Sequence, residues 1–262
     1  MDRFLIAILL AVLHAHSLPA AAQSPYETKA PQEIGLSAAG AGLAATGLYL
    51  NHQIAPLTEE QVNSLSKGDL HPLDRWVTRH WSPRAGKLSD ILRNICLASP
   101  LSLLASNRVR DDAGMVGLMY LETLLLNSAG TLLSKGIFRR TRPFVYNPDV
   151  PMRLKTENKE ARRSFYSGHT ATAFASSFFL AKVYGDFYPD SDWKPAIWSG
   201  AIAISSAVAL LRMLCGKHFL TDVLAGGAVG GLIGYGVPAI HQKTAGKSPS
   251  SGEFMISLAI RF

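Results

Sequence analysis

Six stretches rich in apolar and small residues, separated by polar or proline-containing segments, run through this chain. Each is long enough for a helix, and together they predict helices over 34–53, 88–107, 112–136, 167–184, 195–213 and 217–240. The segment 137–166 contains Pro143, Pro148 and Pro151, which cannot continue a helix. The chain has 262 residues, enough for one sizeable core. The sequence therefore predicts an all-α fold, a single bundle of about six main helices.

The N-terminal segment differs from the predicted bundle. A short apolar run over 4–13 follows Arg3, and 18–22 ends in small residues that signal peptidase accepts. Residues 1–22 are therefore predicted to be a secretory signal, cleaved after Ala22, which exports the protein to the cell envelope. An uncleaved anchor helix is the alternative, although the run is short for a membrane span.

The helical domain is predicted over 23–242, with a linker and tail over 243–262. The linker is rich in Lys, Ser, Pro and Gly, and 254–262 places apolar residues at every second position, as a β-strand does. A terminal strand that ends in Phe262 resembles the assembly signal of outer-membrane barrels, yet one strand cannot close a barrel. Packing of the tail against the helices is the alternative.

Composition leaves a membrane-associated bundle and a soluble periplasmic bundle both open. Charged residues make up only 17% of the chain, which is low for a soluble domain, but the mean hydropathy is modest. Segments 196–211 and 223–240 are apolar enough to span a membrane, whereas 170–182 is short. If all three helices before 137–166 spanned after signal cleavage, that segment would face the cytoplasm. If the first helix did not span, it would face the periplasm.

Cys96 and Cys215 are the two cysteines of the chain. An oxidising compartment would permit a disulfide between them. Two separate, buried thiols are the favoured alternative, because nothing in the sequence places the two residues close together.

Almost all of the net charge of +7 lies in 135–163, which holds nine basic and three acidic residues. Concentrated positive charge indicates an anionic ligand, with a solvated loop or contact with anionic headgroups as the alternative. Lys135 stands near a helix end and Arg142 in the loop that follows. A guanidinium can hold two phosphate oxygens at once, and an ammonium adds a point charge, so both are candidate phosphate ligands.

A second cluster, Ser167, Gly168 and His169, opens the helix predicted over 167–184. Backbone N–H groups at a helix N-terminus bind oxyanions, and glycine lets a ligand approach the backbone closely. His169 would then lie beside the bound phosphate, where it could protonate a leaving alkoxide. Ser167 and Gly168 are therefore candidate phosphate-binding residues, and His169 is a candidate general acid.

A third cluster spans the turn between the last two predicted helices and contains Arg212, His218 and Asp222. Spacing of four residues puts His218 and Asp222 on one face of a helix. An aspartate that bonds to one imidazole nitrogen fixes the tautomer and prepares the other nitrogen to attack phosphorus. Arg212 is a further cation for the phosphate oxygens. Each cluster alone is a weak signal, but their order and their places at helix ends favour phosphoryl transfer.

No cofactor or metal is expected for this reaction, because the cations supply the charge neutralisation that phosphoryl transfer needs. The sequence also shows neither a HExxH pair nor a tight local cluster of histidine and aspartate. The expected partners are a phosphorylated lipid or a small phosphate ester and a membrane, not a nucleic acid.

These three clusters resemble the type 2 phosphatidic acid phosphatase (PAP2) superfamily, which includes bacterial class A acid phosphatases and vanadium haloperoxidases. Its pattern is K-x6-RP, then PSGH, then SR-x5-H-x3-D, and the resemblance covers about 110–240. Lys135 with Arg142 and Pro143, Ser167–His169, and Arg212 with His218 and Asp222 match the three parts. Tyr166 replaces the usual proline and Leu211 the usual serine, and neither carries a proposed chemical role.

The resemblance implies a helical bundle with its site at one end and a metal-independent phosphatase that works through a phosphohistidine. It implies His218 as nucleophile, Asp222 as its partner, and His169 as acid and then base. The remaining matched residues would bind phosphate: Lys135, Arg142, Ser167, Gly168 and Arg212.

The leading interpretation is a lipid phosphate phosphatase on the periplasmic side of a membrane. A soluble periplasmic acid phosphatase is the second. A vanadium haloperoxidase, in which His218 would coordinate vanadate, is disfavoured because such enzymes are usually larger. A non-enzymatic envelope factor is a further alternative, with the terminal strand as its support.

Overall fold

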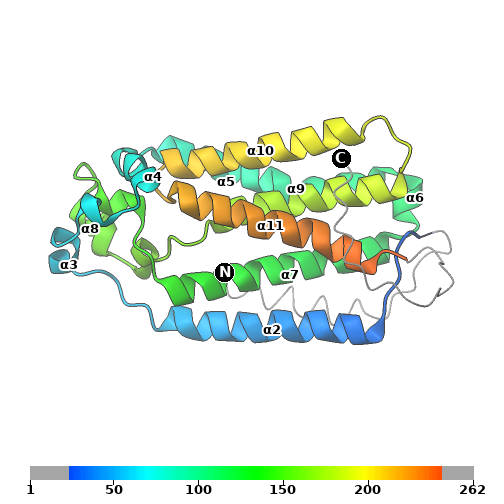
Figure 1. Cartoon of the computed structure of the whole chain (residues 1–262), viewed down its shortest axis with the longest axis horizontal. Helices are drawn as coiled ribbons and strands as arrows, with labels where there is room; N and C mark the ends of the chain where they lie inside the picture. Colours follow the sequence, from blue (N-terminus) through cyan, green and yellow to red (C-terminus); the bar gives the residue numbers. More distant parts are fainter. Residues whose placement is uncertain (1–23, 244–262) are drawn as a thin grey trace, which may run out of the picture.

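The computed structural model describes residues 24–243, and the fold is all-α, as predicted. Six long helices run side by side along the molecule (Figure 1). Their bounds lie within a few residues of the predicted ones, except that the second helix ends earlier and continues as a 3₁₀-helix. The six are α2 (Ala30–His52), α5 (Pro83–Ala98), α7 (Ala113–Phe138), α9 (Gly168–Phe187), α10 (Lys194–Leu214) and α11 (Leu220–His241).

Short helices fill the connections, including the proline-containing segment 137–166. Four are α-helical: α3 (Glu59–Asn63), α4 (Pro72–Arg75), α6 (Asn107–Arg110) and α8 (Met152–Thr156). Five are 3₁₀-helical: η1 (Lys67–Asp69), η2 (Trp76–Arg79), η3 (Ser99–Ala105), η4 (Pro143–Tyr146) and η5 (Lys159–Arg162). Helices α3, α4 and α8 gather at one end of the bundle, called the loop end here, and α2 begins and α11 ends at the opposite end (Figure 1).

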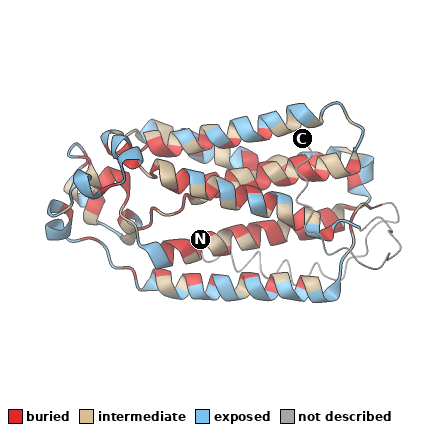
Figure 2. Cartoon of the chain, in the orientation of Figure 1, coloured by how far each residue is buried: buried red, intermediate tan, exposed pale blue. Residues whose placement is uncertain are grey.

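Helix α9 lies at the centre of the bundle, in contact with α5, α7, α10 and α11, and α2 packs on α7. Its inward residues, Phe179 and Val183 among them, are fully buried and join a core with Met119 of α7. Because neighbouring helices surround α9, it is buried on several faces and its apolar residues are not confined to one stripe. The red, buried residues of Figure 2 accordingly concentrate on α9 and on the inner faces of its neighbours.

Glycines let α11 approach α9 backbone to backbone. A Cβ atom at Gly226 would lie 2.6 Å from the carbonyl oxygen of Ser167. At Gly230 and Gly234 it would lie 2.1 Å from the carbonyl oxygens of Ala171 and Ala175. Such close helix contacts require residues without a side chain at the interface. The spacing between α9 and α11 is therefore set by these three positions.

Four helical segments are long and apolar enough to cross a membrane: Pro83–Ala105, Ala113–Tyr146, Lys194–Leu214 and Leu220–His241. Large apolar side chains point outward from them, for example Ile91, Ile202 and Leu232, which is 74% exposed. Contiguous exposed apolar surface marks a membrane or protein contact. Helix α9 is shielded by its neighbours, and its lower hydropathy does not conflict with a position inside such a bundle. These features associate the protein with a membrane.

The predicted signal over 1–22 and the predicted strand over 254–262 lie outside the described residues. At the edge of the described region, Tyr26 and Gln242 form an isolated antiparallel bridge. Cys96 and Cys215 are both free and buried, which is the arrangement the sequence favoured over a disulfide.

Candidate active site

A cavity of about 370 Å³ opens at the loop end, where the three sequence clusters meet. It lies between the end of α7, the start of α9 and the turn from α10 to α11. Among the described residues that line it, six are lysine or arginine, two are histidine and one is acidic. The predicted site residues that line it are Lys135, Arg142, Gly168, His169, Arg212 and His218.

The three predicted cations reach the cavity from different elements. Lys135 lies in the last turn of α7 and Arg212 in the last turn of α10, and both are buried. Arg142 is 4% exposed and braced by two backbone carbonyls, since its Nε donates to Glu160 O (2.7 Å) and its Nη1 to Lys217 O (3.2 Å). A guanidinium held on one side by carbonyl groups is oriented in advance for an anion on the other side.

The second cluster forms the start of α9, as predicted. Ser167 is the N-cap residue, and its hydroxyl accepts a hydrogen bond from the backbone N–H of Thr170. Ser167 is fully buried and does not line the cavity, and its side chain caps the N-terminus of α9. Gly168 does line it, and a Cβ there would lie 2.8 Å from Cγ2 of Thr131. The N-terminal amides of α9 therefore face the cavity across a glycine.

His169 lines the cavity next to Gly168, and its Nε2 lies 2.8 Å from Oδ1 of Asp90 on α5. The same carboxylate oxygen lies 3.5 Å from Nη1 of Arg212. Asp90 thus connects the candidate acid to one of the phosphate cations. Sequence analysis gave Asp90 no place in the site.

The imidazole of His218 is held by a backbone carbonyl. Its Nδ1 lies 2.7 Å from the carbonyl oxygen of Ser164, which can only accept, so Nδ1 carries the proton. The lone pair of the neutral ring is therefore on Nε2. Because His218 lines the cavity, this nitrogen is the one available to a ligand there.

The expected hydrogen bond between Asp222 and His218 is absent among the described contacts, which corrects the sequence interpretation. Oδ2 of Asp222 lies 3.8 Å from Nδ1 of His218. It accepts instead from the Ser164 hydroxyl (2.5 Å) and from the backbone N–H of Phe219 (2.8 Å). The single N–H group at Nδ1 donates its hydrogen bond to the nearer acceptor, the carbonyl of Ser164. Asp222 therefore positions the imidazole through Ser164.

Arg140 completes this support, and sequence analysis missed it. Its Nη1 donates to Oδ1 of Asp222 (2.5 Å) and its Nη2 to Oδ2 of Asp74 (2.8 Å). Asp74 in turn accepts from the backbone N–H and the hydroxyl of Thr221. Both carboxylates are fully buried. Arg140 was counted only within the basic segment, and no local pattern indicates that Asp74 would meet it.

Glu160, Arg163 and Lys217 also line the cavity without having been predicted. The Glu160 carboxylate bonds to Arg142 (3.1 Å) and to Arg163. Burial alone would raise the pKa of Glu160, but Arg142 and Arg163 outweigh it and lower that pKa, so the group is ionised. An anionic ligand that entered the cavity would compete with this carboxylate for Arg142.

Electrostatics keep His218 neutral. Burial lowers the pKa of His218 well below its usual value, and Arg142 and Arg212 lower it further, since the cations oppose a second positive charge. The same causes, burial first and then Arg142 and Arg212, lower the pKa of Lys217 to about 8. The cavity therefore combines a neutral imidazole with a strongly positive wall.

The part of the chain that matches known proteins includes the three clusters that form the cavity. The family model of the PAP2 superfamily matches residues 116–245. Lipid A 4'-phosphatase of Porphyromonas gingivalis is 29% identical over 130 residues, which cover 48% of this chain and 51% of the relative. Lipid A 1-phosphatase of the same organism is 36% identical over 74 residues, covering 28% of this chain and 15% of the relative. The chain thus spans about half the length of the first relative and less of the second.

Among solved structures, this chain is similar to a transmembrane PAP2 type phosphatidylglycerolphosphate phosphatase from Bacillus subtilis. The two share 24% sequence identity with a TM-score of 0.44, over 77% of this chain and 94% of the other.

Proposed function

This chain belongs to the PAP2 superfamily, and on that premise we propose that it is a phosphatase of lipid phosphates that works through a phosphohistidine at His218. The observation that carries the proposal is the cavity itself. It brings a neutral, oriented imidazole and several cations together in a space of about 370 Å³. Phosphoryl transfer requires little more than such positioning and charge stabilisation.

In the proposed first step, Nε2 of His218 attacks the phosphorus atom and the bond from phosphorus to the leaving oxygen breaks. His169 enters this step as imidazolium: burial and Arg212 lower its pKa, and the negative charge of the substrate phosphate opposes that shift. It donates its proton to the leaving oxygen, so an alcohol departs. Lys135, Arg142 and Arg212 hold the three non-bridging oxygens while charge builds on them. The proton stays on Nδ1 and is hydrogen-bonded to the Ser164 carbonyl, and this bond stabilises the positive charge that the ring acquires.

In the second step, neutral His169 takes a proton from a water molecule whose oxygen attacks phosphorus. The bond between phosphorus and Nε2 breaks, and inorganic phosphate leaves with His218 neutral again. The route needs no metal in this cavity, because the basic side chains carry the charge stabilisation.

A lipid substrate is supported by what surrounds the charged wall. Leu97 of α5 and Leu124 of α7 line the same cavity, so one side of it is apolar. A separate apolar cavity of about 860 Å³ lies among α9, α10 and α11, with Phe174, Phe178 and Trp198 in its wall. The relatives whose names specify lipid A act on a phosphorylated lipid. A phosphate at the loop end with acyl chains between helices would fit these surfaces.

A phosphate-release screen on purified protein tests the substrate class. We expect turnover of dispersed lipid phosphates, lipid A and phosphatidylglycerol phosphate among them, to exceed turnover of p-nitrophenyl phosphate in kcat/KM. The reverse order would favour the acid phosphatase interpretation. Vanadate should inhibit; halide oxidation in its presence would instead indicate a haloperoxidase.

The covalent intermediate has its own test. Rapid acid-free quenching with ³²P-labelled substrate should trap label on the protein that is stable in base and labile in acid, as a phosphoramidate is. His218→Ala should abolish both label and turnover. Retained turnover in this variant would exclude His218 as nucleophile.

General acid catalysis predicts a leaving-group effect. His169→Ala should lower kcat/KM, which reports the first step, by about 10²–10⁴-fold for an alkyl phosphate. It should lower kcat/KM much less for p-nitrophenyl phosphate, whose leaving group needs no proton. Equal losses of kcat/KM for both substrates would exclude His169 as the general acid.

We further propose that the cavity opens on the periplasmic side. In this fold, the side on which the cavity opens depends on the path of α2 and on whether the export signal is cleaved. Because α2 begins at the end opposite the cavity (Figure 1), α2 would carry the chain across the membrane if it spans beside α7. If α2 spans the membrane, a periplasmic cavity requires the start of α2 to be cytoplasmic. If the signal is cleaved, the mature N-terminus is periplasmic, and a periplasmic cavity then requires that α2 does not cross the membrane.

Cysteine labelling in intact Gram-negative cells tests the orientation. Glu157→Cys lies near the cavity end and Asp190→Cys in the turn between α9 and α10, and both positions are exposed. A membrane-impermeant maleimide should label position 157 in intact cells and position 190 only after permeabilisation. The opposite pattern would place the cavity in the cytoplasm. The native cysteines are buried, so the wild type is the background control.

A further inference from the structure

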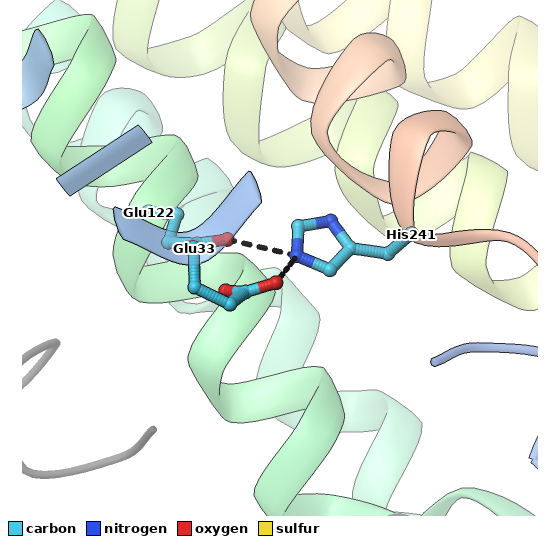
Figure 3. A group of neighbouring side chains, drawn as sticks. All are labelled: Glu33, Glu122 and His241. Atoms are coloured by element: carbon cyan, nitrogen blue, oxygen red, sulfur yellow. Dashed lines mark hydrogen bonds and ion pairs between the residues drawn. The ribbon is translucent and has the colours of Figure 1, made fainter. Parts of the chain in front are cut away.

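Three ionisable side chains meet inside the bundle at the end opposite the active-site cavity. Glu33 comes from the first turns of α2, Glu122 from α7 and His241 from the end of α11 (Figure 3). One ligand atom from each residue lies within 4.8 Å of the others, and all three side chains are buried. Nε2 of His241 lies 3.0 Å from Oε1 of Glu33 and 3.3 Å from Oε2 of Glu122.

The orientation of His241 is set by its other nitrogen. Nδ1 lies 2.8 Å from the carbonyl oxygen of Val237, an acceptor only, so Nδ1 carries the proton. Nε2 of the neutral ring then points a lone pair at two carboxylates. A histidine whose far nitrogen donates to a backbone carbonyl while the near one faces acidic oxygens has the arrangement typical of a metal ligand.

Glu122 supplies an independent observation. Its side chain is 1% exposed, and neither carboxylate oxygen has a hydrogen-bond partner within the described part of the chain. Oε2 of Glu122 lies 3.3 Å from Nε2 of His241, and the Glu33 carboxylate is the other polar group beside it. An ionised carboxylate without such partners is strongly destabilising in a protein interior. With both carboxylates ionised and the imidazole neutral, the cluster would carry a charge of minus two, which a divalent cation would neutralise.

We propose that Glu33, Glu122 and His241 bind one divalent cation, for which Zn²⁺ is the appropriate first probe. Oxygen and nitrogen ligands at about 2.0–2.2 Å from Zn²⁺ in a tetrahedral site are about 3.3–3.6 Å apart. The separations of 3.0 and 3.3 Å from Nε2 to the two glutamates are close to that range. Carboxylate and imidazole together suit zinc and its first-row neighbours.

The role of this site is structural. His218 precedes α11 and His241 ends it, so a helix of this length separates the two by about 34 Å at 1.5 Å per residue. The cation would join α2 to α7 and α11. Backbone hydrogen bonds already join the segments next to α2 and α11 here, because Glu27 N donates to His241 O and Lys243 N to Pro25 O, both at 2.9 Å.

Metal analysis of the whole protein tests the proposal without any assay of turnover. The full chain is purified in detergent with a tag that contains no histidine, incubated with Zn²⁺ and dialysed against metal-free buffer. Elemental analysis should find about one Zn²⁺ per chain. Excess Zn²⁺ at about a hundred times Kd should raise the midpoint of thermal unfolding by about 5–10 °C over the chelator-treated protein.

Glu122→Gln and His241→Gln should each lower the bound Zn²⁺ at least tenfold and remove the response of unfolding to the chelator. Glu60→Gln and His52→Gln, at exposed positions on α3 and α2, are matched controls that should bind as the wild type does. If a variant fails to fold, the titration of the wild type still decides.

Wild-type protein that retains no metal and unfolds at the same temperature with Zn²⁺ and with chelator would overturn the proposal. The three residues would then form a proton-sharing cluster. Metal retained equally by the glutamine variants would overturn it too. None of these outcomes depends on whether His218 is a nucleophile.

Discussion

Ser164 connects His218 and Asp222, two residues of the third sequence cluster. Its carbonyl oxygen orients His218, and its hydroxyl bonds to Asp222, which Arg140 also holds. The carboxylate accepts bonds on both of its oxygens and lies in a fully buried position. Asp222 is therefore placed to position Ser164. The backbone carbonyl of Ser164, and not Asp222, accepts the hydrogen bond that keeps the proton of His218 on Nδ1.

Replacement of Asp222 by asparagine should disrupt this arrangement. One side-chain oxygen becomes an N–H₂ donor that faces Arg140 or Ser164, which are themselves donors to the carboxylate. We expect kcat to fall by roughly 10²–10⁴-fold and stability by about 3–5 kcal/mol, since a buried ion pair loses one partner. Steady-state kinetics and thermal unfolding measure the two effects.

Ser164→Ala provides the matched comparison. It keeps the carbonyl that holds His218 but loses the hydroxyl bond to Asp222, so kcat should fall less than in Asp222→Asn. Equal activity of Ser164→Ala and wild type would show that Asp222 does not act through this hydroxyl.

Lys217 predicts an alkaline limit to phosphate binding. Its pKa, lowered to about 8 by burial and by Arg142 and Arg212, means that the ammonium is charged below that pH and neutral above it. As pH rises through about 8, the cavity loses a cation and KM should increase. Lys217→Arg keeps the charge, so its KM should stay low to higher pH. A pH profile of KM that is identical in the two proteins would contradict this.

At the scale of elements, the site depends on how closely α11 packs against α9. The N-terminal end of α11 carries Asp222, and its backbone oxygen accepts from Ser167 N, 3.0 Å away, at the start of α9. Glycines along α11 continue the contact away from the site. The register of the two helices therefore sets the distance between the second and third motifs.

Gly230→Ala should separate the two helices. The new Cβ would lie 2.1 Å from the carbonyl oxygen of Ala171, a backbone atom that cannot rotate away. We expect a loss of about 1–3 kcal/mol in stability, as for other overpacked positions, together with reduced kcat. Thermal unfolding and phosphate release measure both.

Gly236→Ala is the control on the same helix, because a Cβ there meets no atom within 4 Å. It should be neutral or stabilising by about 0.5–1 kcal/mol through helix propensity. A larger loss from Gly236→Ala than from Gly230→Ala would refute the packing argument.

At the scale of the whole molecule, polarity is arranged around the bundle and along it. Exposed apolar side chains cover the outer faces of α5, α10 and α11, while basic side chains and the short helices α3, α4 and α8 gather at one end. This distribution fits the proposed arrangement, in which the charged cavity lies at a membrane surface and the sides of the bundle face lipid. The proposed cation site at the other end would close the bundle where α2 meets α11.

Leu232→Lys tests which surface faces lipid. Leu232 lies in a candidate span and is 74% exposed. A lysine at the centre of a helical span costs about 2.5–3.5 kcal/mol in insertion, so the yield of membrane-inserted protein should fall. Leu73→Lys, at an exposed leucine of α4 outside the candidate spans, should insert normally. Fractionation with alkaline carbonate measures the yield, and equal yields would argue against a lipid-facing α11.

Several features of this protein follow from local sequence. The six long helices and the interruption at 137–166 depend on residues within a few turns of one another, so composition and prolines predict them well. The same holds for the N-cap at Ser167 and for the placement of Lys135 and Arg212 in last helical turns. Of the predicted site residues, those that face the cavity belong to helix ends and turns that local sequence defines. Their catalytic roles stay predictions.

Contacts between distant segments were decided by tertiary structure. His218 and Asp222 are four residues apart, yet the carbonyl of Ser164, from 54 residues away, accepts the hydrogen bond from the imidazole N–H. Asp74 reaches Arg140, and Glu33 reaches His241 across 208 residues of chain. Sequence spacing fixes which groups share a helix face, because that geometry is local. Which acceptor is nearest depends on how helices pack, and packing is a property of the whole bundle.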